Sequence, residues 1–416
     1  MQKYDVIVVG AGPSGCIAAK YAAKAGASTL IVEKDAEIGV PVQCAGLISK
    51  RAIEESELKD VKAFINKELK GAIVRSHSYE LKIQSPDKTA FAIRRDVFDR
   101  ALAEDALKAG AEIIMSSRIK KLNRGVGGEE LTLAAGDSKE ELKATVVIGA
   151  DGVRSKIAKM AGLSVARHLL SCVQVECEYE AVDAFAEIFI GRNIAPGFFA
   201  WAIPLGAEEV ARIGLCIDKR CSRHSNPLRF LKAFLAEHPE MAERYKGTRT
   251  GFTAGAIPIA TGLHRRMHGL STVRVFKGNG VLLVGDAAAQ VKPITGGGVY
   301  YGLKCGKIAG KIAAEACLSN DMGVLRDYET GWRKEIGAEI AFGLKVHRLR
   351  CILKDSDFDT ICRVLSQEQM LQQIAKQGDM DYQACIFRNF LKNHELIKLA
   401  ARNIIRYLYA KRRLGN

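Results

Sequence analysis

Apolar and polar positions at the start of the chain predict a strand, a helix and a second strand. Residues 4–9 form an apolar run broken only by Asp5, which is typical of a buried strand. Small and apolar residues then recur at helical spacing over about 14–25, and residues 28–32 form a second apolar run. The pattern predicts a βαβ unit over about residues 4–33.

Strand and helix patterns of the same kind return further along the chain. Apolar residues at Val97, Ala101 and Leu102 predict a crossover helix that runs to Gly110. Two more apolar runs, 143–149 and 280–284, indicate strands buried on both faces, and the second precedes a helix predicted to run through residue 316. These segments together predict one doubly wound domain.

Between these segments the pattern changes to short strands separated by Gly, Pro and Asn. Four apolar or alternating runs predict an antiparallel sheet, namely 173–179, 186–190, 198–203 and 210–217. From about residue 324 onward the chain is helical in pattern and basic. The first domain is therefore expected to be interrupted by a sheet domain and followed by helices.

We expect an α/β fold with an α+β second domain. The predicted boundaries are 1–75, 94–166 and 276–320 for the Rossmann-type domain, 76–93 and 167–275 for the sheet domain, and 321–416 for the C-terminal helical region. A chain of 416 residues, 48% of them hydrophobic, is long enough for two cores.

The composition narrows the class of protein. No apolar run reaches 18 residues, so we expect a cytoplasmic protein without a membrane span. The 11 cysteines are widely spaced and form no C-x-x-C pair, which opposes a disulfide framework, a zinc site and an iron–sulfur cluster. Most are expected to be small core residues, and no metal site is predicted.

The net charge of +15 favours an anionic partner. A phosphate-bearing substrate and an anionic membrane both satisfy this charge. No zinc-finger or RNA-recognition pattern accompanies the basic residues, so nucleic acid is not expected as a partner.

A dinucleotide-binding fingerprint occupies the first turn of the chain. Gly10 permits the tight turn, Gly12 lets the backbone approach a pyrophosphate, and Gly15 lets the helix pack against the strand. Glu33, eighteen residues after Gly15, ends the second strand, where its carboxylate can accept hydrogen bonds from a ribose diol. A pyrophosphate would lie at the helix N-terminus, where Ser14 is also found.

Three further motifs allow a structural as well as a functional interpretation. Asp151, after the 143–149 strand, can contact a cofactor or cap the next helix. Arg95 can bind a diphosphate or pair with a nearby aspartate of its own helix. Gly296, Gly297 and Gly298 precede a helix, where they can stabilise an anion or act as a hinge.

Taken in order, these motifs resemble the FAD-dependent flavoproteins related to aromatic hydroxylases, over about residues 1–320. Within that class, the loop with Pro41 and Cys44 and the segment 196–204 resemble the geranylgeranyl reductase family, whose archaeal members saturate the isoprenoid chains of membrane ether lipids. The resemblance implies a Rossmann-type FAD-binding domain of the aromatic-hydroxylase type, a sheet domain that binds substrate, and one non-covalent FAD.

The resemblance also assigns residues. It implies substrate contacts at Phe199, Trp201 and Pro204. It implies cofactor contacts at Gly10, Gly12, Ser14, Gly15, Glu33, Lys34, Cys44, Ala45, Gly46, Arg95, Asp286, Gly296, Gly297, Gly298 and Val299. The glycines before Val299 would face the flavin's pyrimidine edge, where negative charge develops on reduction.

Cys44 is the predicted catalytic residue. The resemblance places its loop near the isoalloxazine ring, where a thiol can protonate a carbon that has taken a hydride. A cysteine without this context is usually a buried filler residue. The segment departs from the family pattern P-x-x-Y-x-W-x-F-P, because Phe199 replaces the tyrosine and Ile203 the second aromatic. Either a hydroxyl proton donor is missing, or the segment mainly lines an apolar channel, which we favour.

The implied activity is FAD-dependent hydrogenation of geranylgeranyl C=C bonds in archaeal-type ether phospholipids, with hydride from reduced flavin N5 and a proton from Cys44 or water. Because the chain has one dinucleotide fingerprint, the reductant, NADPH, NADH or reduced ferredoxin, is expected to bind transiently. Alternatives are an FAD-dependent aromatic monooxygenase or halogenase, and a non-catalytic flavin-bearing electron carrier or membrane module.

The end of the chain offers a membrane contact. Residues Ile397, Ala400, Ala401, Ile404, Ile405 and Leu408 share one face of a predicted helix, with basic residues beside it. The helix either packs on the protein body or lies at an anionic bilayer, which would make the protein peripheral at the inner face of the membrane.

Overall fold

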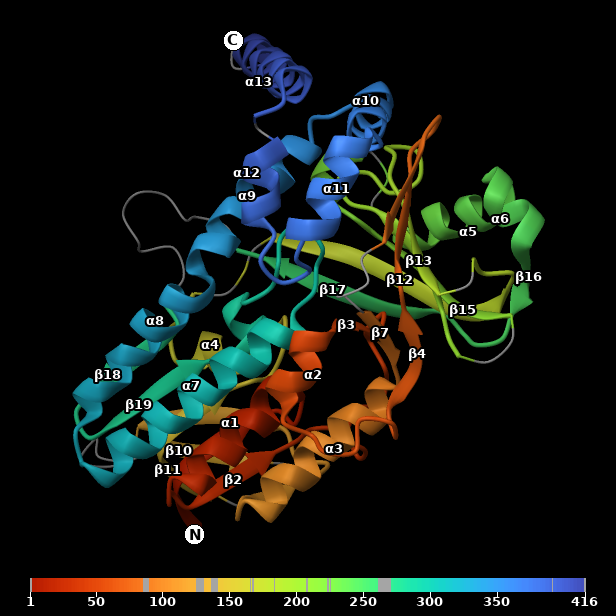
Figure 1. The fold of residues 1–416 in the computed structure, drawn as a ribbon. Helices are drawn as coiled ribbons and strands as arrows, with labels where there is room; N and C mark the ends of the chain where they lie inside the picture. Colours follow the sequence, from red (N-terminus) through yellow and green to blue (C-terminus); the bar gives the residue numbers. More distant parts are fainter. Residues whose placement is uncertain are drawn as a thin grey trace.

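The computed structural model describes residues 2–84, 90–124, 131–135 and 141–414, apart from 165, 167, 183, 207, 208, 223, 225, 261–270 and 391. Figure 1 shows a first sheet covered by helices near the N-terminus, a second sheet beside it, and helices that carry the C-terminus away from both.

The first sheet is built on parallel strands. Its order is β18-β19-β11-β1-β2-β8, with β10 and β9 added beside β11. The parallel pairs are β1–β2, β1–β11, β11–β19 and β2–β8. The bounds are β1 (Gln2–Val9), β2 (Thr29–Val32), β8 (Glu112–Ile114), β9 (Ile119–Arg124), β10 (Leu131–Ala135), β11 (Glu141–Gly149), β18 (Val273–Phe276) and β19 (Asn279–Leu283).

Both faces of this sheet are covered, one by three long helices and the other by a short helix and β9, which explains its uninterrupted apolar strands. On one face α1 (Pro13–Lys24) lies between α3 (Arg95–Lys108) and α7 (Val299–Leu318), packed on Val6 and Val8 of β1. Ile7 points to the opposite face, where it packs with Ile157 of α4 (Lys156–Met160). The strand period of two thus fills both cores.

The second sheet is mainly antiparallel. Its order is β16-β12-β15-β14-β13-β5-β6, with β17 also paired to β12, and only β13 and β5 run parallel. Helices α5 (Pro227–Glu237) and α6 (Pro239–Arg244) cover one face. The bounds are β5 (Gly71–Arg75), β6 (Glu80–Gln84), β12 (His168–Tyr179), β13 (Phe185–Phe189), β14 (Ala200–Pro204), β15 (Val210–Ile217), β16 (Tyr245–Thr248) and β17 (Thr253–Ile259).

A small third sheet and a helix link the two larger layers. The strand order of this third sheet is β3-β7-β4, and the sheet carries the loop that precedes β3. The bounds are β3 (Leu47–Ser49), α2 (Lys50–Ser56), β4 (Ile65–Leu69) and β7 (Ala90–Ile93). The expected boundary at residue 75 therefore falls at the end of β5, a strand of the second sheet.

The C-terminal region is helical, as predicted. A short helical segment, η3 (Met322–Arg326), precedes the first of these helices. A second, η4 (Arg333–Gly337), joins the first helix to the next. The helices are α8 (Asp327–Trp332), α9 (Ala338–Arg350), α10 (Asp355–Leu365), α11 (Glu368–Gln377), α12 (Ala384–Phe390) and α13 (His394–Leu414). Among the described residues, no helix combines the length and apolarity that a membrane crossing requires.

The cysteines form one disulfide among the described residues. Cys172 and Cys216 form a disulfide, and nine other cysteines are free. The two residues lie directly opposite each other on β12 and β15. The sequence prediction opposed a disulfide framework and said nothing of a single pair, and the sequence separation of 44 gives no hint of this register.

Candidate functional site

Two adjoining cavities open at the carboxyl ends of the parallel strands, where ligands bind in open α/β sheets. One, of about 700 Å³, reaches Glu33 after β2. The other, of about 540 Å³, extends between the first and second sheets to Gly298 and Trp201. They share walls, including Gly12, Pro41 and Gly152, and so form one elongated site.

The fingerprint glycines have distinct local reasons. A Cβ on Gly15 would lie 2.0 Å from the Gly10 carbonyl oxygen, and one on Gly10 would lie 2.4 Å from the Ala150 carbonyl oxygen. Both glycines are thus required by packing between α1 and the strands. A Cβ on Gly12 would instead enter open space at the N-terminus of α1, where Ser14 also lines the cavity. The unpaired N–H groups there suit a pyrophosphate.

Glu33 is buried with its carboxylate at the end of the first cavity. It accepts hydrogen bonds from the backbone N–H groups of Ala11, at 2.7 Å, and Asp35, at 2.9 Å. These bonds fix the carboxylate beside the fingerprint turn and leave lone pairs for hydroxyl donors. Lys34 also lines this cavity, but its ammonium group pairs with Asp35.

Arg95 pairs with an aspartate of its own helix and also lines the cavity. Its guanidinium binds Asp99 through two hydrogen bonds, of 3.0 and 2.9 Å, and it also lines the second cavity. Burial acts to lower its pKa, but Asp99 and then Cys44 outweigh burial and raise the pKa above its usual value. Arg95 is therefore a fixed cation in the cavity wall.

Asp286 lies opposite, in the turn η2 (Gly285–Ala288) that follows β19. Burial raises its pKa to about 6, while Arg95 acts in the opposite direction. Asp151 accepts hydrogen bonds from the N–H groups of Lys156 and Ile157 and so caps α4, and it also lines the first cavity.

The three glycines before α7 line the second cavity together with Val299. Gly298 is the N-cap of α7, whose N-terminus therefore faces the cavity. A Cβ on Gly296, whose φ is +75°, would lie 2.6 Å from Ile257, and one on Gly297 would lie 2.7 Å from Lys292. The loop can pass between these side chains only without side chains of its own.

The Cys44 loop lies across the second cavity from α7. The Cys44 thiol sulfur accepts a hydrogen bond from the Gly46 N–H at 3.3 Å. Cys44 and Ala45 line the cavity, whereas Gly46 stands behind them, where a Cβ would lie 2.4 Å from Arg212. Cys44 is partly buried and its thiol is free.

An apolar wall closes the side of the cavity formed by the second sheet. Phe199 and Trp201 line it, together with Ile203 and Phe198. The Phe198 and Phe199 rings stack with centroids 4.4 Å apart, and Phe199 meets Trp201 edge-on at 6.2 Å. Pro204, at the end of β14, is buried but is not part of either cavity's lining.

Sequence reasoning missed a buried ion pair in this wall. The Lys292 ammonium lies 2.8 Å from Asp381, and both side chains are buried and line the cavity. Asp381 comes from the connection between α11 and α12, so the C-terminal region completes the site. Only Lys292 had a sequence signal, since it directly precedes the predicted glycine loop.

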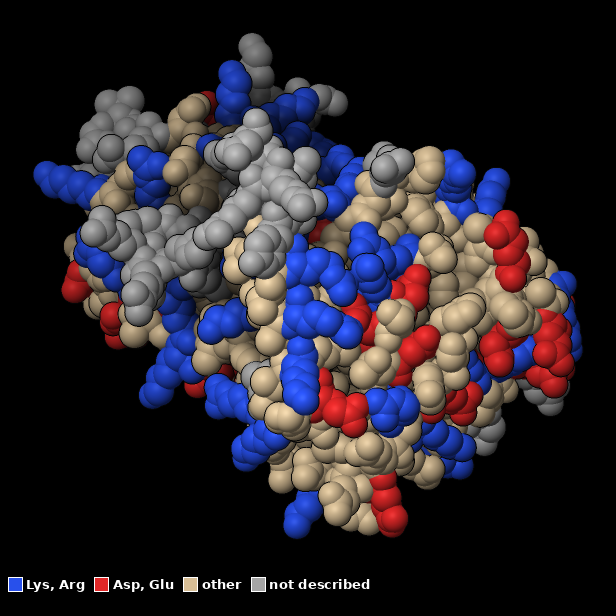
Figure 2. All heavy atoms as spheres, turned by 90° about the horizontal axis from the view of Figure 1, so that it is seen from above, with Lys and Arg blue, Asp and Glu red and all other residues tan. Residues whose placement is uncertain are grey.

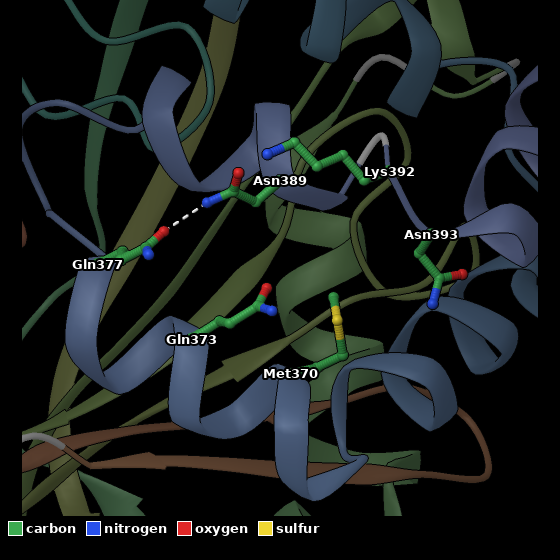
Figure 3. A pocket seen from close by; sticks show the side chains of 6 residues that line it. All are labelled: Met370, Gln373, Gln377, Asn389, Lys392 and Asn393. Atoms are coloured by element: carbon green, nitrogen blue, oxygen red, sulfur yellow. Dashed lines mark hydrogen bonds between the residues drawn. The ribbon is translucent and has the colours of Figure 1, made fainter.

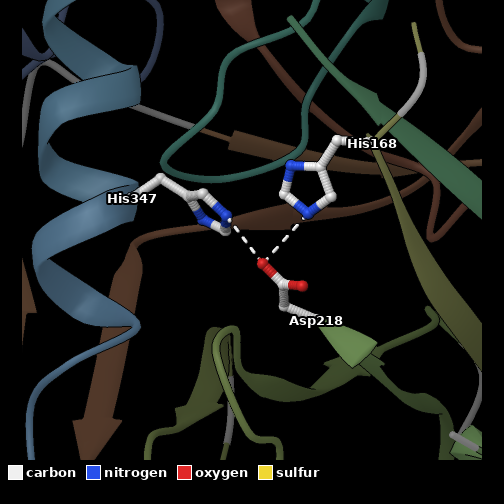
Figure 4. A group of neighbouring side chains, drawn as sticks. All are labelled: His168, Asp218 and His347. Carbon is white, nitrogen blue, oxygen red and sulfur yellow. Dashed lines mark hydrogen bonds and ion pairs between the residues drawn. The ribbon is translucent and has the colours of Figure 1, made fainter. Parts of the chain in front are cut away.

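A second cluster lies behind Phe198. His168, Asp218 and His347 are buried side by side, with the two Nε2 atoms 3.0 and 3.2 Å from Asp218 Oδ2 (Figure 4). Arg350 Nη2 lies 3.0 Å from His347 Nδ1, and because a guanidinium can only donate, His347 Nε2 carries the proton that points to Asp218. This proton occupies the position that a metal ion would need.

The cluster is therefore a hydrogen-bond network centred on a carboxylate. Burial acts to raise the pKa of Asp218, but His168, His347 and Arg220 outweigh it and hold the pKa well below its usual value. Arg350 also donates to the carbonyls of Pro293 and Ile294, just before the glycine loop. The network connects the second sheet, α9 and that loop.

A smaller cavity, of about 330 Å³, lies in the C-terminal region (Figure 3). Its lining is mostly amide side chains, and Gln377 and Asn389 bond to each other across it. The residues are Met370, Gln373, Gln377, Asn389, Lys392 and Asn393. It lacks the carboxylates, glycine turns and aromatic wall of the elongated site.

The elongated site fits a whole dinucleotide cofactor. It provides a carboxylate for a ribose, an open helix N-terminus for a pyrophosphate, and a second helix N-terminus beside a wide cavity for a ring system. These features define a flavoprotein of the FAD-binding class, and the family model described as FAD binding domain matches residues 3–328.

Relatives define the family more narrowly. A digeranylgeranylglycerophospholipid reductase of Methanothrix thermoacetophila is 35% identical over 88% of this chain and 92% of its own length. An uncharacterized protein of Methanocaldococcus jannaschii is 35% identical over 94% of this chain and 96% of its own. A crystal structure of a geranylgeranyl bacteriochlorophyll reductase-like protein of Thermoplasma acidophilum superposes with a TM-score of 0.82, at 26% identity, over 97% of this chain and 100% of that one. The chain belongs to the geranylgeranyl reductase family.

Proposed function

We propose that this protein is an FAD-dependent reductase that hydrogenates C=C bonds in the geranylgeranyl chains of archaeal-type ether phospholipids. The observation that carries the proposal is the union of a dinucleotide site with an aromatic-walled apolar cavity around Cys44. The sequence identity of 35% to a digeranylgeranylglycerophospholipid reductase supports this substrate class.

When bound, reduced FAD supplies the hydride. The protein holds the cofactor with the α1 N-terminus at the pyrophosphate and Glu33 at the adenosine ribose. Arg95 adds a fixed cation near the diphosphate, and the N-terminus of α7 faces the end of the ring where negative charge develops.

The apolar wall binds and aligns the alkene. An unactivated C=C bond is a poor hydride acceptor, so positioning and exclusion of water must lower the barrier. Phe199 and Trp201 offer ring faces and edges without a hydroxyl, which supports a channel-lining role for this segment. The Cys44 thiol, which lines the same cavity, is the proposed proton donor to the carbon that does not receive the hydride.

The electron donor is proposed to bind from outside, as NADPH, NADH or a reduced ferredoxin. All three are anionic, and the net charge of +15 favours their approach.

We also propose a peripheral position at an anionic membrane, through α13. Leu396, Leu399 and Asn403 are buried against the protein body, whereas Ile404 and Ile405 are about half exposed. Figure 2 looks down on the C-terminal helices and shows Lys and Arg side chains spread over this face. An exposed apolar face among cations suits a bilayer that holds the substrate.

Anaerobic reoxidation of the reduced flavin tests the proposed function. The flavin-loaded protein is reduced with dithionite, and unsaturated or fully saturated ether phospholipid is added. We expect recovery of flavin absorbance with the unsaturated lipid only. Recovery that requires oxygen and an aromatic compound would favour the monooxygenase alternative, and no response to either lipid would favour an electron carrier.

A further inference from the structure

The single disulfide of the described residues lies in the wall of the proposed catalytic cavity. Cys172 of β12 and Cys216 of β15 are directly opposed in the sheet, and both line the cavity that contains Cys44 and Trp201. Cys216 is fully buried and Cys172 is partly buried, and the fully buried free cysteines Cys16 and Cys305 do not line this cavity.

The disulfide and the Cys44 loop share one face of the second sheet. Gln174, two residues after Cys172 and so on the same face of β12, donates to the Cys44 carbonyl at 2.9 Å. Arg212, four residues before Cys216 on β15, donates to the Ala45 carbonyl at 2.7 Å. These bonds fasten the loop directly over the strands that carry the disulfide.

The two strands need no further link at this point. β12 and β15 are paired without interruption from Ser171 to Glu178, and Cys172 lies within this ladder. A cross-link that serves only stability would be equally effective outside the cavity, since its effect comes from closing the chain between the two cysteines. Its place in the wall brings the pair, through the partly exposed Cys172, next to whatever the cavity binds.

We propose that Cys172–Cys216 is a second redox centre, which exchanges an electron pair with the flavin. The proposal rests on the proposed function, which places the flavin ring in this cavity. In the forward step the reduced flavin anion gives up two electrons and its N5 proton, and one more proton comes from solvent. The S–S bond breaks, two thiols form, and FAD is left oxidised, so atoms and electrons balance.

A consequence is that the charged protein holds four electrons. The dithiol can return its pair to oxidised FAD by the reverse step, after the flavin has reduced one double bond. The four electrons would then reduce two double bonds, and the external donor would not have to bind again between them.

An electron count tests this proposal on the flavin-loaded protein. Anaerobic photoreduction should take up four electrons per FAD, followed by alkylation and mass spectrometry in which Cys172 and Cys216 both carry the label. The double variant Cys172→Ala/Cys216→Ala should take up two. The matched control Cys385→Ala, at an exposed free cysteine, should still take up four.

Uptake of two electrons by the unmodified protein, with Cys172 and Cys216 still linked by mass, would overturn the proposal, and this readout needs no variant. Equally fast reduction of the pair in flavin-free protein would also overturn it, because the flavin would then not be the donor. Neither result affects the proposed function, whose separate test is reoxidation by unsaturated lipid.

Discussion

The glycines of the fingerprint are of two kinds, which differ in the atoms that an added Cβ would meet. Gly10 and Gly15 are required by the fold, because a Cβ at either position meets a backbone oxygen within 2.4 Å. Gly12 is required by the proposed ligand alone, because its missing side chain faces open space. The motif had already predicted Gly12 as the glycine at the pyrophosphate, and the structure adds the backbone atoms that make Gly10 and Gly15 necessary for the fold.

The variants Gly12→Ala and Gly15→Val test this separation. Gly12→Ala should fold with unchanged thermal stability in its flavin-free form but bind FAD poorly, because the methyl group occupies the space of the pyrophosphate. Gly15→Val should lose both stability and FAD. Gly251→Ala, at a glycine with open space and no proposed ligand, is the control for both. Full FAD occupancy in Gly12→Ala would contradict the placement of the pyrophosphate.

Cys44→Ser tests the proposed proton donor. The substitution should slow reoxidation of reduced flavin by unsaturated lipid about a hundredfold or more, the usual effect of losing a general acid. Reduction of the flavin by dithionite should keep its rate, because that step does not use the thiol. Stopped-flow absorbance measures both rates. Equal lipid-dependent rates in the variant and the unmodified protein would make Cys44 a packing residue.

The raised pKa of Asp286 predicts that the stability of the protein depends on pH. Its pKa of about 6 lies above the ordinary value of 3.8, so the folded protein holds this proton more tightly than the unfolded chain. Its contribution is therefore full below about pH 4 and is lost as the pH rises through about 6. In flavin-free protein, Asp286→Asn should raise the melting temperature at pH 7 and leave it unchanged near pH 4.

The control for this comparison is Asp60→Asn, at an exposed aspartate, which should leave the melting temperature unchanged at both pH values. An Asp286→Asn protein that is less stable than the unmodified protein at pH 7 would show that the ionised carboxylate is favourable in the fold.

At the scale of elements, the spacing of apolar residues predicted the strands and helices in which such residues recur on the same face. The run at 210–217 matches β15 residue for residue, and the helix predicted from Val97 matches α3. Buried strands such as β11 were equally clear, because apolar residues fill both faces. These signals are local, so one sequence was enough.

What sequence could not supply depends on contacts between distant elements. The Lys292–Asp381 pair joins a loop to a connection 89 residues later, and the disulfide depends on the register of β12 against β15. The histidine network also needs β12, β15 and α9 together. No periodic pattern in the sequence links these residues to one another. Only the three-dimensional structure therefore shows that they lie together.

The sequence of helix α13 allowed packing on the protein body or contact with a membrane, and the membrane contact stays a prediction. One face packs on the body, while Ile397, Ile404, Ile405 and Leu408 remain between 43% and 54% exposed. The variant Ile404→Ser/Ile405→Ser/Leu408→Ser should therefore stay folded and lose binding to vesicles that contain phosphatidylglycerol. Raised salt should weaken the binding of the unmodified protein through screening.

Leu318→Ser, at a leucine 60% exposed at the end of α7, is the matched control and should bind vesicles normally. Unchanged vesicle binding in the triple variant at low salt, measured by co-sedimentation, would exclude α13 as the membrane contact.

At the scale of the whole molecule, the site exists because three parts of the chain meet. The first sheet contributes the fingerprint and Asp286, the second sheet contributes Trp201 and the disulfide, and the C-terminal region contributes Asp381. The aromatic-hydroxylase-type fold alone does not determine the chemistry, since the same scaffold serves oxygenation and reduction. The apolar wall and Cys44 support reduction of an alkene.

The mass of the lipid product is the most direct test of this account. Dithionite-reduced, flavin-loaded protein is incubated without oxygen with digeranylgeranylglycerophospholipid, and the lipid is analysed by mass spectrometry. The account predicts mass gains of two hydrogens for each double bond reduced, and none with flavin-free protein. Lipid recovered at its original mass, from protein whose flavin is fully loaded and reduced, would contradict the account.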